Sequence, residues 1–235
     1  MKRRTEAAEK RHANGNTCSA VVLARAKLNS WSWPEGKTAP EGHGGFIRLR
    51  MSYAFGLPDK ACLPAGYEPV AELQFLSRAV MVLLREASVI CYFNPNGEVL
   101  RGEAGFREVF EGCRRQNKLP VQLWTNVRLF NMDQRFRLMD TVGNGQMDIA
   151  DVEAIFPKDK YAPRDVDYYL RNVTLYLLGL KREIKSGEAI DGPGETNLTW
   201  MIERDENGLA QPPRMTVRLF PKVNRAEITT ILNKR

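Results

Sequence analysis

Histidine and cysteine are scarce in this sequence, which has two histidines and four cysteines among 235 residues. No two cysteines form a C-x-x-C pair, and neither His12 nor His43 stands in a recognisable metal-binding motif. A structural zinc site takes several cysteine or histidine ligands at short, regular spacings. The sequence therefore argues against a zinc-binding protein.

Long apolar runs are also absent. The chain has no apolar stretch approaching the roughly 20 residues of a transmembrane helix. Its basic start, Met1-Lys2-Arg3-Arg4, is not followed by the apolar segment of a secretory signal. We therefore expect a cytoplasmic protein that has no membrane among its partners.

The sequence signatures of common enzymes are missing too. It contains no G-x-S-x-G nucleophile elbow, no phosphate-binding G-x-x-x-x-G-K-[ST] loop, no H-E-x-x-H helix and no Rossmann glycine fingerprint. The motifs therefore predict no catalytic residue and no cofactor, which favours a non-enzymatic protein.

What the chain does have is the composition of a globular protein, with 43% hydrophobic and 27% charged residues and a net charge of +7. Apolar residues three and four positions apart predict helices over residues 69–87, 103–116 and from 163 to just before 186. Alternating or short apolar runs predict strands over residues 19–25, 46–51, 89–93, 120–130, 135–142, 151–156, 198–203 and 215–220.

The order of these elements indicates the fold class. Helices and strands are mixed without regular β-α-β alternation, so we expect an α+β fold. It should be a single domain in which a mixed, mostly antiparallel sheet packs against two or three helices. We expect this domain to span residues 18–221, between a flexible basic tail at 1–17 and a polar C-terminal tail at 222–235.

The acidic segment from Asp140 to Asp151 is the most motif-like part of the chain. Its oxygen-bearing side chains fall at ligand positions of a twelve-residue EF-hand calcium loop: Asp140, Asn144, Asp148 and Asp151. Three features weigh against calcium. Val142 supplies no side-chain oxygen at the third position, and Asp151 at the twelfth reaches a bidentate geometry less readily than glutamate. Pro157 also ends any helix that follows the loop after about six residues.

The same segment is also typical of a tight turn between two strands. Gly143 and Gly145 can adopt the positive φ angles that such a turn requires. We favour this strand-turn-strand interpretation, in which no bound cation is needed to hold the shape of the segment.

Carboxylates of this region are nevertheless the candidate metal ligands. Asp151 and Glu153 share one face of an expected strand, and Asp140 and Asp148 are close in sequence. Paired carboxylates can hold a divalent cation or act as acid and base, so the group Asp140, Asn144, Asp148, Asp151 and Glu153 could serve a metal-assisted hydrolase. The plainer alternative, which we favour, is a solvated acidic strand face that forms salt bridges with neighbouring arginines.

Five short motifs, in order, resemble the domain of unknown function 4261 family: Leu119–Trp124, Asp140–Gly143, Asp151–Ile155, Tyr169–Leu178 and Ser186–Gly194. The family has a Leu-Pro strand ending in Trp, a Thr-x-Gly turn, an acidic strand, a helix with Asn and aromatic residues, and a Gly-Asp/Glu-x-x-Gly segment. The resemblance covers about residues 70–220 and departs at the acidic strand, where Asp151 and Glu153 stand in place of Glu-x-Glu. It implies a compact bacterial α+β domain, similar to immunity or interaction domains of polymorphic toxin systems, without an established activity.

Arginines stand at outward positions or ends of expected strands: Arg48, Arg50, Arg128, Arg135, Arg137 and Arg218. If those strands are neighbours, one sheet face presents guanidinium groups suited to phosphates or to an acidic protein. Alternatively, the acidic side of the helix over residues 103–116 covers that face. No RNP-type aromatic motif accompanies the arginines, which disfavours RNA recognition.

Two loops complete the candidate surfaces. Trp31 and Trp33 lie in the Gly/Pro-rich stretch 30–45, where tryptophan can anchor a protein partner or fold back over a core. The glycine-rich segment Ser186–Gly194, which includes Asp191, is either a loop that cradles a ligand or a structural turn. We favour the turn.

These patterns together predict a non-catalytic interaction domain that binds another protein through its sheet face or through residues 30–45. The candidate contacts are Trp31, Trp33, Arg48, Arg50, Arg128 and Arg137. The alternatives are a metal-assisted hydrolase that uses the acidic cluster and an arginine-mediated nucleic-acid binder.

Overall fold

The structure, a computed structural model, describes residues 20–51, 66–180, 182–194 and 198–233. Contacts within the chain divide it into two compact units. Of the described residues, the first unit comprises 20–51, 66–124 and 146–148, and the second comprises 125–145, 149–180, 182–194 and 198–233. The expected basic tail at residues 1–17 lies outside the described residues.

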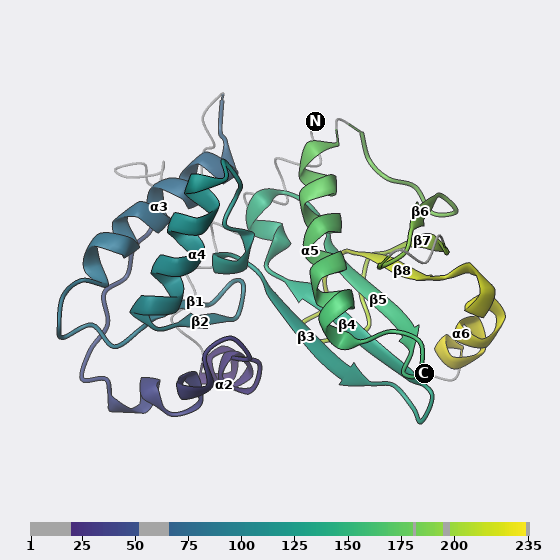
Figure 1. Cartoon of the computed structure of the whole chain (residues 1–235), viewed down its shortest axis with the longest axis horizontal. Helices are drawn as coiled ribbons and strands as arrows, with labels where there is room; N and C mark the ends of the chain where they lie inside the picture. The colour runs from purple at the N-terminus through teal and green to yellow at the C-terminus, as the bar shows by residue number, and fades with distance from the viewer. Residues whose placement is uncertain (1–19, 52–65, 181, 195–197, 234–235) are drawn as a thin grey trace, which may run out of the picture. The chain divides into compact units, whose positions relative to one another are not determined.

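The first unit combines helices with a small hairpin (Figure 1). Its helices are α2 (Ala20–Leu28), α3 (Pro69–Leu83) and α4 (Glu103–Arg115), and its hairpin pairs β1 (Tyr92–Asn94) with β2 (Val99–Arg101). Short 3-10 turns η1 (Pro34–Lys37), η2 (Ala39–Gly42) and η3 (Val121–Leu123) connect them. The helices expected over residues 69–87 and 103–116 are therefore confirmed.

The hairpin of the first unit has a tight turn that its sequence explains. The side-chain Oδ1 of Asn94 accepts hydrogen bonds from the backbone N–H groups of Asn96, at 3.1 Å, and Gly97, at 3.2 Å. A Cβ atom added at Gly97 would lie 1.9 Å from the carbonyl oxygen of Trp124. Only glycine therefore fits at this close approach of two backbone segments.

Two strands expected in the first unit are wrong. Residues 20–28 form helix α2, because a short apolar run rich in alanine, leucine and basic residues suits a helix as well as a strand. Residues 46–51 alternate like a strand but have no regular secondary structure, and Phe46, Ile47 and Leu49 are exposed. Alternation makes a strand only where a neighbouring strand supplies hydrogen bonds.

The second unit is built on a six-stranded sheet. The strands are β3 (Asn126–Asn131), β4 (Phe136–Val142), β5 (Asp151–Pro157), β6 (Ala189–Asp191), β7 (Thr199–Asp205) and β8 (Thr216–Pro221). Their order is β3-β4-β5-β8-β7-β6, and every pair is antiparallel except β5 with β8. The expected α+β class with a mixed, mostly antiparallel sheet is confirmed.

Helix α5 (Pro163–Gly179) covers one face of this sheet (Figure 1). Its apolar side packs on alternate strand residues, with Val166, Leu170 and Val173 buried against them. The opposite face carries a second apolar cluster that includes Ile228 of helix α6 (Arg225–Leu232), in the region expected to be a polar tail. Among the described residues, no helix has both the length and the apolar character needed to cross a bilayer.

One expected strand is too long, and one strand was not expected. Residues 121–123 form the 3-10 turn η3, and Trp124 keeps a helical backbone, so the strand predicted over residues 120–130 begins only at Asn126. Strand β6 occupies part of the glycine-rich segment 186–194, where composition alone suggested a turn or a loop.

The close approach at Gly97 can be tested by alanine substitution. Gly97→Ala should lower the free energy of unfolding by about 2 kcal/mol or more, because the new methyl group collides with backbone that has little freedom to move. Gly105→Ala, within α4 and with no atom near the new Cβ, should instead stabilise the protein by up to about 1 kcal/mol. Urea unfolding of both variants measures this, and equal effects would contradict the packing described.

Candidate functional site

The acidic segment forms a strand-turn-strand unit. Strands β4 and β5 pair antiparallel with Asp140 opposite Glu153, and Gly143 between them has a φ of 117°. The expected strand-turn-strand order is therefore confirmed. The connection is longer than the tight turn expected, because the 3-10 turn η4 (Asn144–Met147) lies within it and Gly145 does not adopt a positive φ. The helices that flank an EF-hand loop are absent on both sides of this described segment, because its flanks are strands.

Charged side chains form a row across four strands of the sheet, on the face opposite α5. Neighbouring strands place Arg128 beside Asp140, Asp140 beside Glu153, and Glu153 beside Arg218: one row of Arg128, Asp140, Glu153 and Arg218. All four residues are buried, and Asp140 and Glu153 have no exposed surface. Two carboxylates side by side repel each other, so the flanking guanidinium groups are needed to hold them together.

Each end of this row is an ion pair with short hydrogen bonds. Arg128 donates to both oxygens of Asp140, from Nε at 3.0 Å and from Nη2 at 2.6 Å. Arg218 donates from Nε to Glu153 at 2.6 Å and from Nη2 to Asp205 of β7 at 2.6 Å. Two N–H donors from one guanidinium fix the orientation of the arginine and its carboxylate partners, in addition to the attraction between their opposite charges.

The segment 206–215 closes over the row and supplies another guanidinium. Arg214 donates to Asp151 Oδ2 at 2.9 Å, to the carbonyl of Thr141 at 2.7 Å, and to Asp140. Two backbone groups of the segment join in: the N–H of Leu209 donates to Glu153, and the carbonyl of Gln211 accepts from Arg128. We call these seven charged residues the carboxylate–arginine network: Arg128, Asp140, Asp151, Glu153, Asp205, Arg214 and Arg218.

Burial and hydrogen bonding act on the protonation of this network in opposite directions. Burial raises the pKa of Asp151, and the Arg214 guanidinium, the Asn144 N–H and the Thr141 hydroxyl oppose that rise. At Asp205, the Asn207 N–H and the Arg218 guanidinium hold the pKa below its usual value.

The candidate metal ligands are thus engaged by other partners. Asp140, Asp151 and Glu153 face guanidinium groups, and Asn144 donates from its amide to the Ala150 carbonyl and the Thr174 hydroxyl. Asp148 is only partly buried and groups with the first unit. Within the described ranges, no three histidine, cysteine or acidic side chains gather closely enough to hold a metal ion.

The arginines do not form the exposed field that their positions suggested. Arg128 is fully buried and Arg137 is partly buried, whereas Arg48 and Arg50 are exposed in the irregular segment 46–51 of the first unit. The expectation of one guanidinium-covered sheet face is therefore wrong. Carboxylates of the sheet itself neutralise the arginines that lie on it.

The two tryptophans of the 30–45 stretch have different surroundings. Trp33 folds back, since Cβ atoms added at Gly36 and Gly102 would come within about 3 Å of its ring. The Trp31 side chain is 65% exposed. Of the two expected anchors, Trp31 alone is therefore well placed to contact a partner.

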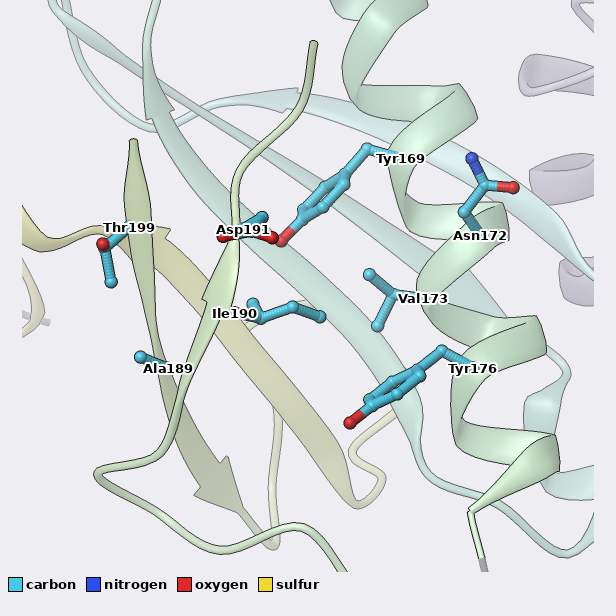
Figure 2. A pocket seen from close by; sticks show the side chains of 8 residues that line it. All are labelled: Tyr169, Asn172, Val173, Tyr176, Ala189, Ile190, Asp191 and Thr199. Carbon is cyan, nitrogen blue, oxygen red and sulfur yellow. The ribbon is translucent and has the colours of Figure 1, made fainter. Parts of the chain in front are cut away.

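A pocket of about 540 Å³ lies between α5 and the β6–β7 edge of the sheet (Figure 2). Tyr169 and Tyr176 project from α5 toward β6, which contributes Ile190 and Asp191 to the facing wall. The Tyr169 side chain is nearly buried and packs edge-on against Trp200, with ring centroids 5.3 Å apart. Burial raises the pKa of the Tyr169 hydroxyl, and Asp191 adds to that rise.

Sequence reasoning missed both the network's closing residue and this pocket. Arg214 lies 63 residues from its partner Asp151, beyond the reach of any spacing rule. The pocket did have a signal: tyrosines seven positions apart share one face of the expected helix, and the glycine-rich segment with Asp191 faces them.

The second unit is thus an α+β structure whose sheet is covered by a helix on one face and holds a charged network on the other. The family model of Domain of unknown function (DUF4261) matches residues 140–220, which confirms the resemblance to that family over about a third of the chain. No curated protein and no solved structure matches the chain.

The network should respond strongly to loss of one cation. Arg214→Met removes the guanidinium shared by Asp140 and Asp151, so it should lower the free energy of unfolding by about 3 kcal/mol or more, measured by urea unfolding. Arg135→Met is the matched control, because Arg135 pairs with Glu227 at an exposed surface and should contribute less than about 1 kcal/mol. Similar losses in the two variants would contradict a buried role for Arg214.

Acid should weaken the network through Asp205. Because its pKa lies below the usual 3.8, the unfolded chain takes up this proton first, and stability is lost as pH falls through the pKa of the folded state. Asp205→Asn should therefore show a shallower loss of stability below about pH 4 than the unsubstituted protein. Thermal melting between pH 5 and 2 tests this, with Glu206→Gln as a control that keeps the steeper loss.

Proposed function

We propose that this protein is a non-catalytic, cytoplasmic domain that binds another protein, in the manner of a bacterial immunity protein. One observation carries the proposal: residues 28–49 of the first unit expose large apolar side chains, with Trp31 65%, Phe46 79% and Ile47 68% exposed. We call residues 28–49 the exposed apolar segment. Large exposed apolar groups in one stretch of chain are typical of partner-binding surfaces.

The chemistry of this segment indicates what kind of partner it fits. Arg48 and Arg50 are exposed between and beside the apolar residues. An apolar groove rimmed by carboxylates would match both the side chains and the charge.

Neither alternative function has comparable support. A hydrolase would need carboxylates accessible to a metal ion or a water, whereas Asp140 and Glu153 are fully buried against arginines. A nucleic-acid binder would need Arg128 and Arg218 at the surface, and both are buried in ion pairs.

Serine substitutions test the proposed surface. Trp31→Ser and Ile47→Ser should each reduce capture of the partner from cells at least tenfold, because a tryptophan or a large aliphatic anchor contributes strongly to an interface. Val82→Ser is the matched control, since Val82 on α3 is equally exposed at 61% and lies outside the segment. Quantitative mass spectrometry of material captured by tagged wild type and variants measures the effect, and melting curves check folding.

Two results would overturn the proposal. One is a wild-type protein that captures nothing above an untagged background. The other is a partner that all four proteins capture equally, which would place the interface outside the exposed apolar segment.

A further inference from the structure

One polar group that lines the pocket between α5 and β6 has no partner within the described part of the chain. The Tyr169 hydroxyl makes no hydrogen bond although the residue is only 9% exposed. Burying a polar group without a hydrogen bond costs free energy unless another molecule supplies the bond. The arrangement therefore points to a ligand.

Among the described residues that line the pocket, Asp191 is the only charged one, and its charge is negative. Asp191 lines the pocket and interacts electrostatically with the Tyr169 hydroxyl, but it forms no ion pair with any described residue. Arg182, which interacts electrostatically with Tyr176, donates hydrogen bonds to both carboxylate oxygens of Glu188, each at 2.7 Å. A negative charge without a counter-ion thus faces two tyrosine rings.

The walls add to this preference for a cation. Aromatic rings attract cations through their negative faces, and Tyr169 and Tyr176 stand seven residues apart on α5, about 10 Å along the helix axis. Val173 lies between them, and Ile190 faces it from β6 (Figure 2). An apolar stem would therefore find apolar contacts while its charged end meets the carboxylate.

We propose that this pocket binds an aliphatic ammonium group, with the positive charge at Asp191 and the apolar stem between Tyr169, Val173 and Ile190. The ammonium group belongs either to a free amine or to a lysine side chain of a peptide, since both present the same chemistry. The site uses no residue of the exposed apolar segment. A failure of amine binding would therefore leave the proposed protein-binding function unaffected, and the reverse also holds.

Titration with small amines tests this proposal on the full chain. The probes are n-butylamine and Nα-acetyl-lysine N-methylamide, and the neutral comparison is the lysine probe acetylated on its side-chain nitrogen. Calorimetry and ¹H–¹⁵N spectra should show saturable binding of the charged probes at concentrations up to about 10 mM, with shifts at residues 169–191. Equal binding of both charged probes indicates a free amine, and tighter binding of the lysine probe indicates a peptide.

Matched variants identify the charge that carries binding. Asp191→Asn should raise the Kd of the charged probes at least tenfold, because it removes the counter-ion without changing shape, and Tyr169→Phe should raise it a few-fold. Glu206→Gln removes one exposed carboxylate outside the pocket and should leave the Kd unchanged. No saturable shift, equal binding of the neutral probe, or an unchanged Kd in Asp191→Asn would each overturn the proposal.

Discussion

The pairing of buried carboxylates with buried guanidinium groups is the constraint on which the second unit depends. Asp140 and Glu153 are neighbours on adjacent strands with no exposed surface, and without guanidinium partners their mutual repulsion would disrupt this arrangement. Arg128 and Arg218 flank them, and Arg214 reaches in from the segment 206–215. Because charge cannot be buried unpaired, each of these residues requires the others.

The network also gives the sheet a register that apolar packing alone would leave less defined. The row aligns β3, β4, β5 and β8 at one level, and a shift of one residue in any strand would turn a charge toward the apolar face under α5. The same contacts hold the segment 206–215, whose backbone binds Glu153 and Arg128. The network therefore stabilises one strand order and one path of the following chain.

The sequence predicted an element correctly where its local hydrophobic pattern determines the secondary structure. It failed where the secondary structure depends on pairing with a distant segment. The helix that begins at Pro163 and the strands around Asp140 and Glu153 follow their periodicity, because each buries one face against the same core. Residues 46–51 show equally clear alternation and form no strand, since a strand requires a partner that periodicity does not specify.

The site illustrates the same limit for charge. Spacing within the acidic segment matched several ligand positions of a calcium loop, yet the nearest cations are arginines that arrive from β3, β8 and the segment before β8. Charge pairing across 63 or 65 residues leaves no periodic signal in a single sequence. The preferred expectation was correct about the salt bridges to arginines and wrong about solvent, because Asp140, Asp151 and Glu153 are buried.

The range of the family match includes some features of the molecule and leaves others out. Residues 140–220 contain Asp140, Arg214 and Arg218 of the network and every residue that lines the pocket, whereas Arg128 and the exposed apolar segment lie outside. Asp140 therefore keeps one of its two guanidinium partners, Arg214, within the matched range. Within the matched range, every buried carboxylate of the network therefore has an arginine partner, and the pocket lies in the same range. The exposed apolar segment lies outside it.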